Sequence, residues 1–160
     1  MCLWVDADSF PRQARHYIQQ TAIQHKIKLV YVANKRIPFD FDSPLFSAVI
    51  QPSEKNAADN YIFDNCNEND IVFTRDIEFA KRLSDKKITA LNDRGAIFDT
   101  KTLAKMLKEK ALSEQMELLG LHTGKSRHHY GRQELEAFIK TFNTVLEQTP
   151  INGFPSSYPC

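Results

Sequence analysis

The sequence has few cysteines and no pattern that would use them. Cys2, Cys66 and Cys160 are its three cysteines, and no CxxC spacing occurs. This excludes a disulfide framework and a thiolate zinc site, and it is typical of a cytoplasmic protein with reduced thiols. No apolar run is long enough to cross a membrane, and Asp6 and Asp8 interrupt the apolar start too early for a signal peptide. We therefore expect a cytoplasmic protein without membrane contact.

The sequence also lacks an excess of charge of either sign. It contains 21 Lys and Arg against 20 Asp and Glu, which gives a formal net charge of +1. A strongly basic nucleic-acid coat and an acidic tail are excluded, whereas a local basic patch is not. The length of 160 residues predicts one domain, over residues 1–148. Residues 149–160 contain three prolines and are expected to form a C-terminal tail.

Short apolar runs alternate with segments of helical period along the chain. This alternation predicts an α/β fold, a three-layer α/β/α sandwich with a mainly parallel five-stranded sheet in the order 3-2-1-4-5. We expect loops at 35–47 and 121–132, and a break near Lys110 in the fourth helix. The predicted strands are 2–5, 28–34, 48–51, 70–74 and 88–91, and the predicted helices are 9–26, 53–66, 77–86, 100–119 and 132–148.

Acidic residues follow several of the predicted strands. Asp6 and Asp8 follow the first strand, Asp76 follows the fourth, and Asp59 lies in the helix after the third. In the order 3-2-1-4-5, the first and fourth strands are neighbours where the strand order reverses, which is where open α/β sheets bind ligands. Carboxylates without histidine or thiolate suit Mg²⁺ or Mn²⁺. The pattern therefore predicts a metal site at this edge of the sheet.

Helix capping is the alternative interpretation of each acid. An Asp directly after a strand often caps the following helix, which stabilises it by about 1 kcal/mol. Asp6 is the strongest metal candidate because Asp8 and Ser9 are better placed to cap the next helix. Glu54 and Asp93 are the weakest candidates. Whether Asp8 is a ligand or a cap stays open.

A polar loop at 121–132 carries several basic residues and no acid. Its cations could bind a phosphate backbone, or they could form a solvated loop without a ligand. Asn34 ends the second strand and could reach the same edge of the sheet, although an Asn there also forms turns. The candidate substrate-binding residues are Asn34, Lys35, Arg94, Lys125, Arg127 and Arg132.

Five segments in order resemble one bacterial family. They are "VDADSFP", "VYVAN", "AADNYI", "DIVFTRDIEFAKRL" and "ALNDRG". The chain resembles the YaiI/YqxD family, also called UPF0178 or DUF188, from about Leu3 to Leu146. That family is uncharacterised and is grouped with the PIN-like nuclease folds. The resemblance implies a PIN-like sandwich with Asp6, Asp59 and Asp76 in an acidic cluster and Asp8 close by.

The sequence departs from the pattern of this family at three places near the expected site. Ser9-Phe10-Pro11 stands where the family usually has Ala-Cys-Pro. Asp93 stands where it has Pro, and Gly131 where it has Asp. The core acids are kept, so the metal hypothesis survives, while the altered surroundings bear on substrate choice and on activity.

Three functions are compatible with these residues. The leading hypothesis is a divalent-metal-dependent nuclease that acts on RNA rather than DNA. The second is a haloacid-dehalogenase-type phosphatase that uses Asp6 as nucleophile and Asp8 as general acid. That enzyme type also needs Ser or Thr at the position of Asn34, and usually a cap that this chain has little room for. The third is a non-catalytic module that binds RNA or protein. A homo-oligomer is compatible with each.

Overall fold

The computed structural model describes residues 1–121 and 129–149. Its centre is a five-stranded sheet in which every neighbouring pair of strands is parallel, in the order β3-β2-β1-β4-β5. The predicted strand order is therefore confirmed, and β1 and β4 are adjacent. The strands are β1 (Cys2–Asp6), β2 (Lys28–Ala33), β3 (Phe46–Ile50), β4 (Ile71–Phe73) and β5 (Thr89–Leu91).

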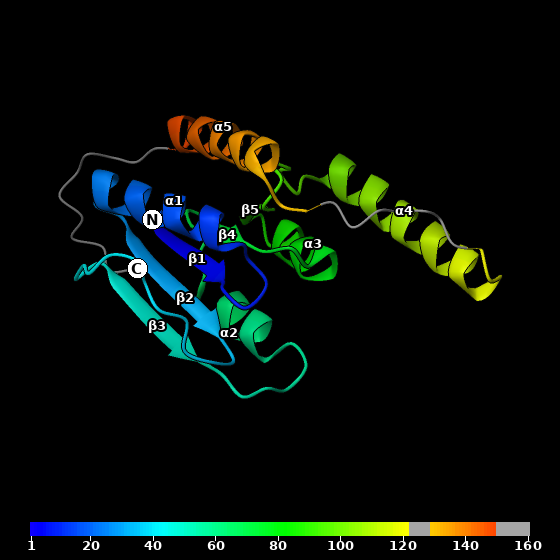
Figure 1. Ribbon diagram of the computed structural model, residues 1–160, viewed down its shortest axis with the longest axis horizontal. Helices are drawn as coiled ribbons and strands as arrows, with labels where there is room; N and C mark the ends of the chain where they lie inside the picture. The colour runs from blue at the N-terminus through cyan, green and yellow to red at the C-terminus, as the bar shows by residue number, and fades with distance from the viewer. Residues whose placement is uncertain (122–128, 150–160) are drawn as a thin grey trace.

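Helices cover both faces of this sheet, as Figure 1 shows. One face packs against α1 (Arg12–His25) and α5 (Arg132–Gln148). The other packs against α2 (Ala57–Asn65), α3 (Ile77–Asp85) and the first turns of α4 (Thr100–Leu118). The predicted three-layer α/β/α architecture is confirmed. Among the helices of residues 1–121 and 129–149, none is long and apolar enough to cross a membrane.

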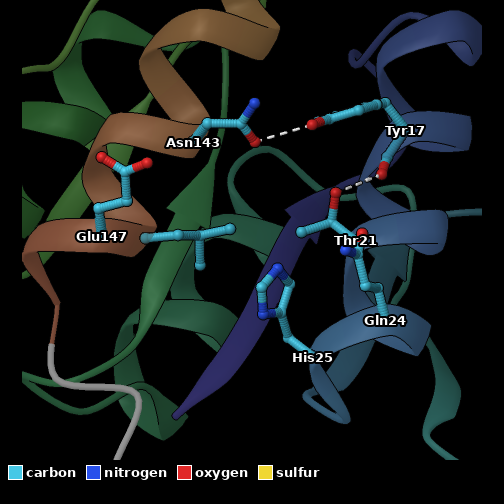
Figure 2. A pocket seen from close by; sticks show the side chains of 7 residues that line it. Tyr17, Thr21, Gln24, His25, Asn143 and Glu147 are labelled. Atoms are coloured by element: carbon cyan, nitrogen blue, oxygen red, sulfur yellow. Dashed lines mark hydrogen bonds between the residues drawn. The ribbon is translucent and has the colours of Figure 1, made fainter.

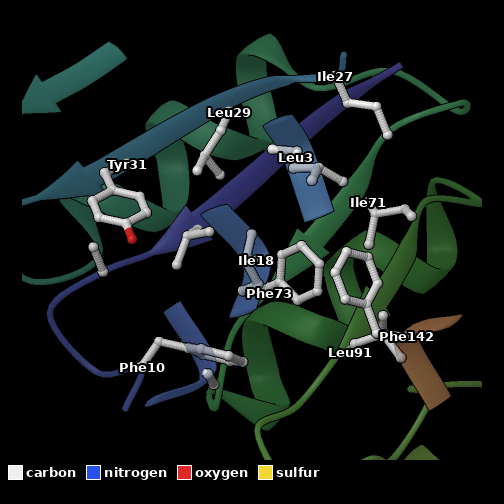
Figure 3. Packing of buried hydrophobic residues seen from close by; sticks show 14 of the residues in the cluster. Leu3, Phe10, Ile18, Ile27, Leu29, Tyr31, Ile71, Phe73, Leu91 and Phe142 are labelled. Carbon is white, nitrogen blue, oxygen red and sulfur yellow. The ribbon is translucent and has the colours of Figure 1, made fainter. Parts of the chain in front are cut away.

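The two faces of the sheet form two separate hydrophobic cores. Leu3 and Phe73 point toward α1 and α5, where Phe73 meets Phe142 with 5.0 Å between ring centroids (Figure 3). Trp4 follows Leu3 in β1, and Val72 precedes Phe73 in β4. Both belong to the core on the other face. Side chains alternate between the faces along a strand, so a strand covered on both faces is apolar throughout. The central strands are thus fixed in register, and so are the residues that follow them.

Two local predictions are wrong. α4 continues to Leu118 without a break at Lys110, because lysine favours a helix and Lys110 Nζ lies 2.9 Å from Glu78 Oε1 of α3. α1 begins at Arg12 and no side chain caps it, so Ser9 does not act as its cap. By contrast, Asp99 caps α4, since its carboxylate accepts a hydrogen bond from the Thr102 N–H at 2.7 Å.

The turn after β5 is held tightly against α5. Gly95 has a φ of 84°, and a Cβ at this position would stand 2.6 Å from the Ala137 carbonyl oxygen. Only glycine fits such a conformation and such an approach. Thr141 Oγ1 donates a hydrogen bond to the Gly95 carbonyl at 2.8 Å, and Tyr130 Oη donates one to the Asp93 carbonyl at 2.8 Å. This turn therefore places Asp93 at a fixed position beside the end of β4.

Candidate functional site

Asp6 ends β1 at the point where the strand order reverses, and its side chain is buried. Ser9 Oγ donates a hydrogen bond to Asp6 Oδ2 at 3.0 Å, and Thr74 Oγ1 lies 3.4 Å from the same oxygen. Burial raises the pKa of Asp6 above its ordinary value, the hydrogen bond from Ser9 lowers it, and the charges of Asp8 and Asp76 raise it further. Asp6 is thus a carboxylate held in place in a site that disfavours its charge.

Asp59 and Asp76 come from two other elements and meet near Asp6. Asp59 lies in the first turn of α2 and is buried. Burial, together with the charges of Asp6 and Asp76, raises its pKa to about 7, although the charge of Arg82 acts to lower it. Asp76 also caps α3, because its Oδ1 accepts a hydrogen bond from the Phe79 N–H at 3.0 Å. We call Asp6, Asp59 and Asp76 the acidic cluster.

Asp8 does not cap α1, the helix that follows it. Its carboxylate is exposed and accepts a hydrogen bond from the Asn34 N–H at 2.7 Å, which ties the loop after β1 to the end of β2. The expectation that Asp8 or Ser9 caps α1 is wrong, because Pro11 occupies the N-cap position and the Ser9 hydroxyl binds Asp6 instead. Asp8 remains near enough for its charge to act on Asp6.

Two helices begin at the acidic cluster. Asp59 lies in the first turn of α2, and Asp76 immediately precedes α3. Helix N-termini carry a partial positive charge and free N–H groups, which favour negative groups nearby. These dipoles offset part of the repulsion among the three carboxylates, and they favour a bound anion at the same place.

The chemistry of the cluster fits a hard divalent cation, although its ligands are not arranged for one. The donors are carboxylate oxygens, which Mg²⁺ and Mn²⁺ prefer. Within residues 1–121 and 129–149, no Lys or Arg forms an ion pair with the cluster, and no group of three or more His, Cys, Asp or Glu side chains stands in position to hold a metal ion. Cation binding would require Asp59 to lose its proton and the carboxylates to reorient.

The candidate substrate-binding residues do not form one patch in the described part of the chain. Asn34 and Lys35 follow β2 and are exposed at the same edge as the cluster, and Arg94 is exposed in the turn after β5. Arg132 lies on α5, where its Nε is 2.8 Å from Glu136 Oε1. Lys125 and Arg127 lie outside the described residues.

Arg75 also belongs to this edge, and the sequence did not single it out. Its Nε lies 3.4 Å from Asp93 Oδ2, and its Nη1 lies 3.4 Å from the Ser9 carbonyl oxygen. Arg75 thus connects the turn after β5 to the loop after β1. Its signal in the sequence is its place between Thr74 and Asp76, directly after a buried strand.

A separate pocket lies between α1 and α5 (Figure 2), and no residue of the acidic cluster lines it. Tyr17 Oη donates a hydrogen bond to Asn143 Oδ1 across it at 2.7 Å. Three of the four residues of α1 that line it, Thr21, Gln24 and His25, belong to the second half of the helix, which runs back toward the amino-terminal edge of the sheet. The pocket therefore does not extend the acidic site. It is lined by Tyr17, Thr21, Gln24, His25, Asn143, Leu146 and Glu147.

Comparison with known proteins gives a family and no activity. A "UPF0178 protein" of Treponema denticola is 32% identical over 146 residues, which cover 91% of this chain and 92% of the relative. A "UPF0178 protein" of Pseudoalteromonas atlantica is 32% identical over 148 residues, which cover 92% and 99% of the two chains. No solved structure matches the chain. The profile described as "Uncharacterized BCR, YaiI/YqxD family" (DUF188) matches residues 4–148, so the chain belongs to this family.

Proposed function

We propose that this protein is a divalent-metal-dependent nuclease that hydrolyses phosphodiester bonds, in RNA rather than in DNA. The acidic cluster would hold Mg²⁺ or Mn²⁺, and the exposed cations around the same edge would bind the nucleic-acid strand. The preference for RNA rests on the grouping of the YaiI/YqxD family with PIN-like nuclease folds, and the rest of the proposal rests on the arrangement of the cluster.

One observation carries this proposal: three carboxylates from β1, α2 and the start of α3 converge where the strand order reverses. Burial of Asp59, with the charges of Asp6 and Asp76 added to it, raises the pKa of Asp59 to about 7. A fold gains no stability from crowding buried carboxylates, and such groups concentrate at functional sites. A divalent cation would remove the repulsion that the cluster contains.

Each residue of the site would have a distinct role. Asp6, Asp59 and Asp76 would supply oxygen ligands, and Ser9 and Thr74 orient Asp6 through its Oδ2. Asp59 would release its proton as the cation enters, so cation affinity would rise as the pH rises through about 7. When bound, such a cation lowers the pKa of water and withdraws charge from a phosphoryl oxygen.

The test is cleavage of an end-labelled single-stranded RNA in Mn²⁺, in Mg²⁺ and in excess EDTA, beside a DNA of the same sequence. We expect metal-dependent RNA cleavage that Asp6→Asn lowers by roughly 100-fold or more, since even residues that only orient a metal ligand contribute about 10- to 100-fold. Asp42→Asn is the matched control, because Asp42 is an exposed acid outside the cluster.

Two outcomes would overturn the proposal and identify another function. Rapid hydrolysis of a simple aryl phosphate without RNA cleavage would show a phosphatase, and trapping of a phosphate analogue on Asp6 would confirm it. RNA binding that persists in EDTA, with no cleavage in any metal, would show a non-catalytic binding module.

A further inference from the structure

The residues before and after Arg75 in the sequence, Thr74 and Asp76, both tie it to the acidic cluster. On one side, Thr74 Oγ1 lies 3.4 Å from Asp6 Oδ2 and accepts a hydrogen bond from the Asp76 N–H at 3.1 Å. On the other side, Asp76 contributes its own carboxylate to the cluster. The Cα of Arg75 is therefore held at the border of the cluster, and only its long side chain is free to point toward or away from the carboxylates.

The side chain turns toward Asp93, which is itself immobilised and buried. The Asp93 side chain is 4% exposed, and its Oδ2 accepts no hydrogen bond within the described residues. The guanidinium of Arg75 lies 3.4 Å from this oxygen, and it is the only ion-pair partner of Asp93 in that part of the chain. A buried carboxylate without a cation is strongly unfavourable, so the guanidinium is drawn to this place.

The same attraction keeps the guanidinium away from the acidic cluster. Arg75 directly precedes Asp76, and an arginine so close would ordinarily pair with one of three crowded carboxylates. Instead its contacts are with Asp93 and with the Ser9 carbonyl oxygen. The side chain remains 51% exposed, and these two contacts occupy only part of the five N–H donors of a guanidinium.

We propose that Asp93 positions Arg75 to bind a phosphate of the nucleic-acid strand beside the acidic cluster, and that it prevents Arg75 from neutralising the carboxylates that would hold the cation. This inference rests on the proposed function. It assigns Arg75 to substrate binding and makes Asp93 a positioning residue that acts only through Arg75. A planar guanidinium held in one orientation suits bidentate binding of phosphate oxygens.

The test measures Mn²⁺ affinity by calorimetry for the wild type, Asp93→Asn, Arg75→Ala and the double variant, each checked for its fold by circular dichroism. Asp93→Asn releases the guanidinium toward the cluster, so we expect about a 10-fold loss of Mn²⁺ affinity, the scale of outer-shell effects. Arg75→Ala should not weaken Mn²⁺ binding, and adding it to Asp93→Asn should restore the affinity. A merely structural role of Asp93 predicts no such restoration.

A second measurement follows RNA binding in EDTA by fluorescence anisotropy at several salt concentrations. Arg75→Ala should reduce the slope of log affinity against log salt by about one, the loss of a single phosphate contact, whereas Arg75→Lys should retain the slope with weaker binding. An unchanged slope in Arg75→Ala would overturn the phosphate contact. Wild-type Mn²⁺ binding that Asp93→Asn leaves unchanged would overturn the positioning role alone. Absence of Mn²⁺ binding in the wild type would overturn the proposed function, and the salt slope would still decide the role of Arg75.

Discussion

Carboxylates are buried at both edges of the sheet, and the groups that surround them differ between the two edges. At the amino-terminal edge, Asp70 is 4% exposed and accepts hydrogen bonds from the Cys2 N–H at 2.8 Å, Trp4 Nε1–H at 3.1 Å and the Asn67 N–H at 2.9 Å. At the carboxyl-terminal edge, Asp6 and Asp59 are each 8% exposed and face other carboxylates. Similar burial thus accompanies opposite surroundings.

This contrast shows that repulsion from neighbouring carboxylates, rather than burial alone, distinguishes a candidate functional acid from a structural one. Three N–H groups compensate the charge of Asp70, and they join the start of β1 to the start of β4. Burial raises the pKa of Asp59 to about 7, and the charges of Asp6 and Asp76 add to this effect. A carboxylate that is satisfied inside the fold needs no ligand, whereas a crowded one favours a cation or a proton.

Removing the satisfied carboxylate should have the largest effect on stability. Asp70→Ala leaves three donors without their acceptor, two of them on β1, and we expect it to lower the free energy of unfolding by roughly 3 kcal/mol or more. Urea denaturation followed by Trp4 fluorescence measures this. Asp70→Asn keeps one oxygen acceptor and should lose less. A loss below 1 kcal/mol in the alanine variant would mean that this edge does not depend on Asp70.

Removing a crowded carboxylate should instead raise the free energy of unfolding. The pKa of Asp59 is about 7 when folded and near 4 when unfolded, so the folded state binds more protons between these values and stability falls as the pH rises through that window. Asp59→Asn should raise the free energy of unfolding at pH 8 by roughly 1–2 kcal/mol, less than the full pKa difference implies because solvent screens part of the interaction.

The pH dependence shows whether Asp59→Asn acts by removing a charge or by a change in stability that is the same at every pH. At pH 4.5 the folded wild type already holds the Asp59 proton, so Asp59→Asn and the wild type should have nearly equal free energies of unfolding. Urea denaturation in metal-free buffer at both pH values measures the difference. A variant that is less stable than the wild type at pH 8 would show that the cluster is held by attraction and not crowded.

Replacing two helix-capping residues should give the smallest change in stability, and comparing the two variants separates capping from cation binding. Asp76 caps α3 and Asp99 caps α4, each through one backbone N–H. Serine also caps well, so Asp99→Ser, and Asp76→Ser at pH 4.5 where Asp59 is protonated, should each change the free energy of unfolding by less than about 0.5 kcal/mol. In a thermal shift assay, only Asp76→Ser should lose the stabilisation by Mn²⁺. Equal Mn²⁺ responses in the two variants would reduce Asp76 to a cap.

The sequence predicts the layers of this fold better than the partners of its acids. Apolar strands and their alternation with helices sufficed for the strand order, and that order brings Asp6 and Asp76 together. The role of Asp70 was not predicted, because its donors on β1 lie 66 and 68 residues away along the chain. The same holds for Asp93, whose burial depends on the turn at Gly95 and its contact with α5. Local spacing does not contain such long-range contacts.

The most direct test of the central claim is the site of Mn²⁺ binding in solution. Substoichiometric Mn²⁺ broadens the NMR signals of nuclei near the ion, so we expect the backbone amide signals of Ala7, Asp59, Asn60 and Arg75 to weaken first in ¹⁵N-labelled protein. Asp6→Asn should abolish this selectivity. Broadening that is absent, uniform, or centred on acids outside the cluster such as Asp40 would contradict a cation site formed by Asp6, Asp59 and Asp76.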